Sequence, residues 1–250
     1  MTREEALRRI HRAAEENLTE LDLAGLELEE LPPEIGKCTQ LEKLVLGRVK
    51  SWRGGADGKM TPQPTTNQLT LLPDELLSLG NLRAINLSCN PFGKMPELLL
   101  EMKQLESLNL TSIGLTEIPE YLGRLSNLTK IDLSFNRLNL IEDILEKEVL
   151  GKLCKILCQL SKLTHIHLCG NQIAEIPEAL CQLSNLTHLD LFSNHITQIP
   201  EAVTQLSSLM LLKLRRNEIA EIPDKIAQLS NLAYLVIRLK PISRYARLDN

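Results

Sequence analysis

The sequence predicts an α/β solenoid: a curved, right-handed array with a parallel β-sheet on its concave side and short helical or 3-10 segments on its convex side. The phrase L-x-x-[LI]-x-L-x-x-N-x-[LI]-x-x-[LI]-P recurs every 23 residues, most clearly from Leu163, Leu186 and Leu209. Units with such a period bury their apolar faces against each other. Aromatic residues are only 3% of the 250-residue chain, so the core must be aliphatic, filled by Leu and Ile.

Residues 1–17 are expected to form an N-terminal capping helix. Thr2 and Glu5 match a capping box, and an apolar stripe follows them at helical spacing. The stripe comprises Ala6, Leu7, Ile10, Ala13 and Ala14. We expect it to cover the open end of the first repeat, and a partner-binding role is the alternative.

About nine repeats are expected over residues 18–237. They begin at Leu18, Leu41, Leu82, Leu105, Leu128, Leu163, Leu186, Leu209 and Leu232. In each repeat the first half of the phrase predicts a short strand with inward Leu and Ile side chains. The Asn can satisfy backbone groups of the turn that follows, and the Pro suits the first turn of a short helix. Leu26 and Ile113 replace this Asn, so we expect a less regular ladder there.

Two insertions interrupt the period. Residues 47–66 are rich in Gly and Pro and are expected to form a mobile loop. Trp52 in this loop is surrounded by basic residues, and it could anchor a partner or fold back over the concave face, while a disordered loop is the alternative. Residues 142–160 predict one long convex-side helix with a wide apolar stripe. Packing against neighbouring segments is favoured for it, with weak self-association as the alternative.

The remaining features bound the class of protein. Residues 238–250 form a basic tail, either a terminal cap or the cut end of a longer array. The net charge of −4 gives no reason to propose nucleic acid or an anionic membrane as the main partner. The start lacks an apolar signal region and the apolar runs are too short to span a bilayer, which indicates a cytoplasmic protein with no membrane partner. Six scattered cysteines, Cys38 among them in an inward position, are expected to be free thiols.

The repeats, with I-P-x-x-[LIVA]-x-x-L-x-x-L after the Asn turn, resemble the 23-residue leucine-rich repeats of intracellular Ras-group and LAP-type scaffolds. The opening, from Glu16 to Gly36, resembles the start of bacterial proteins in which such repeats precede a Roc GTPase domain. The resemblance covers about residues 17–237. It implies a leucine-rich-repeat solenoid that presents a curved surface to another protein. No GTPase domain is present in this chain, so no nucleotide activity is implied; a regulatory region of a larger Roc-COR-type GTPase assembly is an alternative.

The concave face carries the predicted binding residues. Residues between the inward positions fall into three columns that run across the strands. In the third and fourth repeats the columns present small neutral groups such as Ser88 and Thr111. In the last four repeats they carry the aromatic and Arg side chains that protein interfaces enrich. The predicted partner-binding residues are Trp52, His165, His167, His188, Asp190, Phe192, Leu211, Lys213, Arg215, Arg216, Tyr234 and Arg238.

Metal and catalytic roles are weaker interpretations. His165, His167 and His188 could form a zinc or nickel site or a pH-sensitive surface, but exposed histidines on a flat sheet diverge and no spacing motif selects a metal site. We therefore expect no metal and no cofactor. Residues 54–60 resemble a phosphate-binding loop that is one residue short. Cys169 has a His nearby but no oxyanion hole. The predicted function is a non-catalytic protein-interaction scaffold, not an enzyme.

Overall fold

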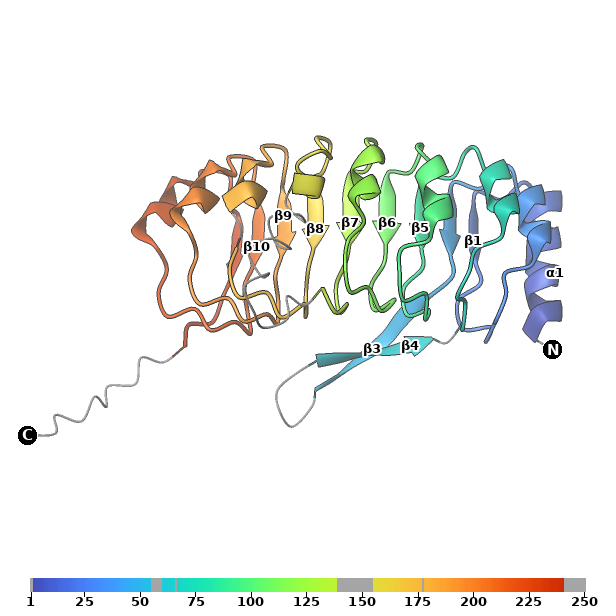
Figure 1. Cartoon of the computed structure of the whole chain (residues 1–250), viewed down its shortest axis with the longest axis horizontal. Helices are drawn as coiled ribbons and strands as arrows, with labels where there is room; N and C mark the ends of the chain where they lie inside the picture. The colour runs from blue at the N-terminus through green and yellow to red at the C-terminus, as the bar shows by residue number, and fades with distance from the viewer. Residues whose placement is uncertain (1, 55–59, 66, 139–154, 177, 241–250) are drawn as a thin grey trace, which may run out of the picture.

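The computed structural model describes residues 2–54, 60–65, 67–138, 155–176 and 178–240. The α-helix α1 (Thr2–Glu15) lies at one end of a nine-stranded parallel sheet whose order is β1-β2-β5-β6-β7-β8-β9-β10-β11. The strands lie side by side along the long axis, with short helices along one edge and turns along the other (Figure 1). The predicted solenoid, with its parallel sheet and N-terminal helix, is confirmed.

Each strand is three residues long. The bounds are β1 (Glu20–Asp22), β2 (Lys43–Val45), β5 (Ala84–Asn86), β6 (Ser107–Asn109), β7 (Lys130–Asp132), β8 (His165–His167), β9 (His188–Asp190), β10 (Leu211–Lys213) and β11 (Tyr234–Val236). The middle residue of each strand points inward because side chains alternate along a strand. In the strands of this sheet from β1 to β10, which exclude β3 and β4, that residue is at most 6% exposed. These middle residues are Leu21, Leu44, Ile85, Leu108, Ile131, Ile166, Leu189 and Leu212.

Seven 3-10 helices form the convex edge over the described residues. They are η1 (Pro33–Lys37), η2 (Asp74–Ser78), η3 (Glu97–Glu101), η4 (Glu120–Arg124), η5 (Glu178–Gln182), η6 (Glu201–Gln205) and η7 (Asp224–Gln228). The repeat's Pro stands immediately before the helix, as at Pro73 (φ −74°) and Pro200 (φ −67°). A fixed φ in this range directs the chain into the turn without needing a backbone N–H.

Buried asparagines join neighbouring repeats. Oδ1 of Asn136 accepts hydrogen bonds from the N–H groups of Ile113, Gly114 and Leu115 in the preceding repeat. Its Nδ2 donates to the carbonyl of Leu110 at 2.8 Å. The turn at Ile113 is therefore satisfied by the next repeat's amide. Asn67 does the same for the turn at Leu26, so both turns are satisfied although their own repeats lack the Asn. The replacement by Ile113 changes the preceding turn, where the N–H of Phe92 donates to the carbonyl of Asn90.

The first insertion forms a β-hairpin, so the predicted mobile loop is wrong over its described part. β3 (Arg48–Gly54) pairs antiparallel with β4 (Met60–Thr65), and the hairpin projects from the turn edge of the sheet (Figure 1). Pro62 and Pro64 are compatible with β4 because both strands of an isolated hairpin have a free edge, where proline removes no ladder hydrogen bond. Trp52 pairs with Pro62 through the backbone, and its side chain lies outside the described part of the structure.

The other predicted segments are described only in part. Of the helix expected at 142–160, residues 142–154 lie outside the described residues, whereas Ile156, Leu157 and Leu160 are buried in the core. Of the tail, residues 241–250 lie outside them too. The N–H of Lys240 donates to the carbonyl of Ile219, which ties the start of the tail to the preceding repeat. No helix within the described ranges is long and apolar enough to cross a membrane.

The two ends of the solenoid differ. The apolar stripe of α1 is buried against the first repeat, as predicted, with Ile10 and Ala6 fully covered. Cys38 is a buried free thiol whose Sγ donates to the carbonyl of Ile10 at 3.3 Å. At the opposite end Leu235 is only partly buried and Tyr234 is 68% exposed, because β10 is the only strand that β11 pairs with in the described chain.

Candidate protein-binding surface on the concave face

The strand register confirms the first two predicted columns. The first strand residues form one row: Glu20, Lys43, Ala84, Ser107, Lys130, His165, His188, Leu211 and Tyr234. The third strand residues form the next: Asp22, Val45, Asn86, Asn109, Asp132, His167, Asp190, Lys213 and Val236. Because the strands are parallel and in register, side chains in one row stand beside each other about 4.8 Å apart.

His165 and His188 form a stacked pair in the first row. Their ring centroids are 4.1 Å apart and the rings are within 8° of parallel. Nδ1 of each ring lies within hydrogen-bond distance of the preceding Thr hydroxyl, Thr164 at 2.8 Å and Thr187 at 2.9 Å. Partial burial, and then the neighbouring His188 and Lys130, lower the pKa of His165 to about 4. The expectation that these histidines diverge is therefore wrong: they form a flat platform, and His165 is neutral at pH 7.

The second row has a role in the turns that the sequence analysis missed. Asp132 and Asp190 each accept, through Oδ1, the backbone N–H two residues ahead, that of Ser134 at 3.0 Å and Phe192 at 3.1 Å. Asp or Asn in this position mimics a turn hydrogen bond. The second carboxylate oxygen then serves the adjacent repeat. Asp190 is 8% exposed, so it supports the surface from below.

Two of these carboxylates hold basic side chains in place. Oδ2 of Asp190 accepts from Nζ of Lys213 at 2.9 Å, and this hydrogen bond raises the pKa of Lys213. Oδ2 of Asp132 lies 3.6 Å from Nδ1 of His167, and the hydrogen bond to Asp132 raises the pKa of His167. Burial opposes ionisation of Asp132, but the hydrogen bonds from His167 and Ser134 keep its pKa below the ordinary value. His167 and Lys213 are therefore oriented before any partner arrives.

The third predicted column is largely buried, which corrects the predicted map. Ser88 and Thr111 are 1% and 3% exposed, so the third and fourth repeats do not present them to solvent. The ladder continues just past the strands, because the N–H groups of Cys89 and Ser112 donate to the carbonyls of Thr111 and Ser134 in the next repeat. Cys169 is buried as well: its N–H donates to Oγ of Ser134 at 3.1 Å. Burial raises the pKa of the Cys169 thiol, so it is no nucleophile at neutral pH.

In the repeats that follow Cys169, the residues beyond the strand ends are larger and more exposed. The guanidinium of Arg216 lies 5.6 Å from the ring centroid of Phe192, a cation–π distance. Phe192 is half-buried, whereas Arg215 and Arg238 are exposed. Leu211 is half-buried in the first row between His188 and the exposed Tyr234. The predicted residues other than Trp52 thus lie on or just below one continuous surface, while their role in binding a partner stays a prediction.

A hollow of about 290 Å³ adjoins the histidine platform. Lys130, Asp132, His165 and His167 line one side of it, and β6 provides the other through Ser107, Leu108 and Asn109. Lys130 is exposed and has no ion-pair partner among the described residues. The predicted binding surface starts at the sixth repeat. The hollow extends this surface to β6 and β7. Lys130 was not among the predicted binding residues. Its positive charge in the first predicted column, next to His165, is the signal in the sequence that could have identified it.

The described residues contain no group of three or more His, Cys, Asp or Glu side chains that could hold a metal ion. Stacking explains this for His165 and His188, because parallel rings direct their nitrogens side by side and do not converge on one point. His167 is engaged by Asp132.

Comparisons with known proteins agree with this architecture. A family model described as Leucine Rich repeats (2 copies) matches residues 161–209. No curated protein matches the chain. A leucine-rich-repeat protein of Leptospira interrogans has 25% identity and a TM-score of 0.61; the alignment covers 93% of this chain and 63% of that one, so this chain spans less than two thirds of its length.

Two further solved structures are similar. Internalin C2 of Listeria monocytogenes has 22% identity and a TM-score of 0.67, covering 93% of this chain and 91% of that one. The ectodomain of the Arabidopsis thaliana receptor kinase GASSHO1/SCHENGEN3, solved in complex with CASPARIAN STRIP INTEGRITY FACTOR 2, has 28% identity and a TM-score of 0.52, covering 82% of this chain and 22% of that one. The protein is thus a leucine-rich-repeat solenoid, structurally similar to bacterial leucine-rich-repeat proteins and internalins.

Proposed function

We propose that this protein is a non-catalytic recognition module that binds a protein partner on the concave face of its last four repeats. The observation that carries the proposal is the run of Phe192 with Arg216, the stacked His165 and His188, and the exposed Tyr234 on one rigid sheet. Aromatic and Arg side chains dominate binding energy at protein interfaces. The similar plant ectodomain was solved in complex with a named factor, which supports this use of the fold.

The surface favours a partner with acidic and apolar groups. Arg215, Arg216 and Lys130 present positive charge around the histidine platform, and Lys213 is held by Asp190. The sheet is fixed by its ladder and by the buried asparagines, so few groups lose freedom when a partner binds. The cytoplasmic location, and the alternative of a regulatory region in a Roc-COR-type GTPase assembly, stay predictions. So does the finer resemblance to Ras-group and LAP-type repeats.

A second candidate is a pH-responsive binding surface. The 4.1 Å stack supports it, because a proton on one imidazole disfavours a proton on the other. Acidification to about pH 4 would then charge His165 and change the fit of the platform to a partner. His167 is not part of this pair and is bound to Asp132 instead. The surface therefore holds one histidine with a lowered pKa, His165, and one with a raised pKa, His167.

The test is affinity capture from native lysate with wild type beside the Phe192→Ala/Arg215→Glu variant, followed by titration of the purified captured protein. We expect the double variant to weaken binding by about 2 kcal/mol or more, roughly thirtyfold, since it removes an aromatic anchor and reverses a charge. Lys43→Glu, a charge reversal in the first row on β2 and far from the last four repeats, is the control and should bind as wild type. Equal affinity of the double variant, with an unchanged melting temperature, would exclude the concave site.

A further inference from the structure

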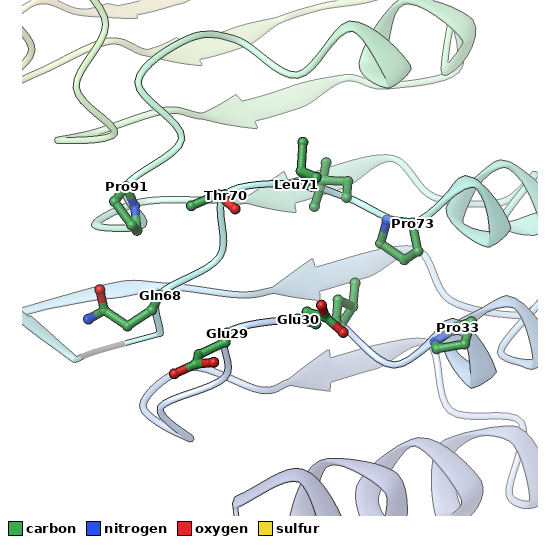
Figure 2. A pocket seen from close by; sticks show the side chains of 10 residues that line it. Glu29, Glu30, Pro33, Gln68, Thr70, Leu71, Pro73 and Pro91 are labelled. Carbon is green, nitrogen blue, oxygen red and sulfur yellow. The ribbon is translucent and has the colours of Figure 1, made fainter.

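A groove lies on the side of the solenoid opposite the sheet, between the return segments of the first two repeats. These segments, Glu29–Pro33 and Gln68–Pro73, run side by side in front of the strands (Figure 2). Pro91 of the third repeat adds to the lining, and the groove measures about 790 Å³. Glu29 and Gln68 lie toward one end and Pro33 and Pro73 toward the other (Figure 2). None of the proposed concave-face residues lines it.

Leu71 is the unusual residue of this groove. It is 76% exposed, the most exposed large hydrophobic side chain among the described residues. In the six other repeats that carry the Pro, the residue two positions before it is charged or polar and exposed: Glu30, Lys94, Glu117, Glu175, Gln198 and Glu221. The core has no need of Leu71, since Leu69 fills the inward position with 0% exposure and Leu72 packs against the core. The fold therefore does not account for an apolar side chain here.

The rim of the groove is acidic. Glu29 and Glu30 are exposed, and neither has a basic partner within the described ranges. Some acidic side chains elsewhere are paired across repeats, as Glu218 is with Lys240 and Glu201 with Lys225. An apolar side chain beside two unpaired carboxylates is complementary to an apolar residue flanked by basic ones.

The frame of the groove is fixed before binding. Oδ1 of Asn67 holds the N–H groups of Leu26 and Leu28, and the N–H of Gln68 donates to the carbonyl of Leu28 at 2.7 Å. Pro33 and Pro73 fix the chain at the other end. A preformed groove of this volume is in the range of natural ligand sites, about 300–1,000 Å³. Little ordering is needed for a ligand to bind.

We propose that this groove docks an extended segment of a partner protein in which an aliphatic or aromatic side chain is flanked by Lys or Arg. The apolar residue would contact Leu71, Leu31 and Leu72 between the two segments, and the basic residues would pair with Glu29 and Glu30. A symmetric contact between two copies of this chain is disfavoured because it would bring the same carboxylates together. The site is separate from the concave surface and does not depend on it.

The test is selection of random peptides displayed on phage with wild type and with Leu71→Glu/Glu30→Lys. The variant should fold, because Glu and Lys each occupy the Leu71 column in other repeats. We expect wild type to enrich peptides with a basic–apolar–basic pattern and the variant not to enrich them. A fluorescein-labelled Arg-Lys-Leu-Leu-Lys-Arg peptide is then titrated by anisotropy. Leu71→Gln, which introduces the side chain that Gln198 carries in the same column, should weaken its binding about tenfold, the loss expected when an apolar contact at the centre of a site is removed.

Two controls separate this site from others. Glu175→Lys changes charge in the same column far from the groove, and Phe192→Ala/Arg215→Glu alters the concave face; both should bind the peptide as wild type. Raising salt from about 50 to 500 mM should weaken binding, since the carboxylates are exposed. The proposal is overturned if no basic–apolar–basic pattern is enriched or if Leu71→Gln binds the peptide as tightly as wild type does. It is also overturned if Leu71→Gln abolishes self-association in sedimentation while wild type binds no peptide, because the groove would then be a contact between copies.

Discussion

At the scale of single residues, neighbouring histidines on the concave face acquire opposite protonation behaviour. Partial burial and the adjacent His188 and Lys130 lower the pKa of His165 from 6.5 to about 4, whereas the hydrogen bond to Asp132 raises the pKa of His167. Repeat spacing predicted that these side chains share a face, because the register follows from the period. It could not predict which ring stacks and which pairs with a carboxylate, since that depends on side-chain rotamers.

This difference predicts a pH dependence of stability. Between pH 6.5 and about 4 the unfolded chain binds a proton at His165 that the folded protein does not, so His165 lowers stability as pH falls through that range. His167 acts in the opposite direction: its stabilisation is complete below pH 6.5 and is lost as pH rises through its raised pKa. His165→Gln should therefore lose less stability than wild type between pH 7 and pH 5.

The measurement is the urea midpoint of unfolding at each pH. The effect will be smaller than the full pKa shift implies, because the ring is partly exposed. His11→Gln, at an exposed position of α1, is the control and should follow wild type. A His165→Gln midpoint that falls with pH as steeply as that of wild type would contradict the assignment.

At the scale of elements, the Leu and Ile positions predicted every strand of the main sheet and both open rows, because alternation and a fixed period determine which residues face outward. The prediction of a loop for the first insertion is wrong because Gly and Pro are also compatible with strands that have a free edge, as both strands of this hairpin do. The buried third column could not be seen from alternation, which ends where the strand ends. The role of Asp132 and Asp190 in the turns could have been predicted from the sequence, because each is an Asp two residues before the backbone N–H that it accepts.

Gly47 is where the hairpin leaves the sheet, and no larger residue fits there. A Cβ at this position would lie 1.7 Å from the carbonyl oxygen of Ser88 and 2.9 Å from Nδ2 of Asn90. Gly47→Ala must therefore displace the turn after β5 and strain the Asn90 hydrogen bonds to the carbonyls of Leu46 and Leu87. We expect a loss of about 3 kcal/mol in the free energy of unfolding, measured by urea denaturation.

Gly80→Ala is the matched control for Gly47→Ala. A Cβ at Gly80 would meet no atom within 4 Å, so this change should leave stability nearly unaltered. If both variants unfold at the same urea concentration, the close packing of the hairpin base against the turn of β5 is not a constraint on the fold.

At the scale of the whole molecule, stability is shared between neighbouring repeats. Each repeat contacts the one before and the one after through the strand ladder and the buried amides, as Asn194 shows by accepting from Ile173 and donating to the carbonyl of Leu168. A second set of amides, Asn127 and Asn185 among them, links successive repeats on the segment that leads into each strand. Damage in the middle of such an array removes two interfaces, whereas damage at an end removes one.

Leu189→Asp and Leu235→Asp test this arrangement with the same chemical change. Leu189 is 0% exposed between β8 and β10, so a carboxylate there is buried without a partner and should cost about 4 kcal/mol or more. Leu235 is partly buried, and within the described ranges β11 pairs with β10 alone, so water can reach the new carboxylate. Hydrogen exchange should show lost protection across β8, β9 and β10 for Leu189→Asp but only in β10 and β11 for Leu235→Asp. If Leu235→Asp also exposed β8 and β9, the array would unfold as one cooperative unit and its stability would not be a sum over neighbouring repeats.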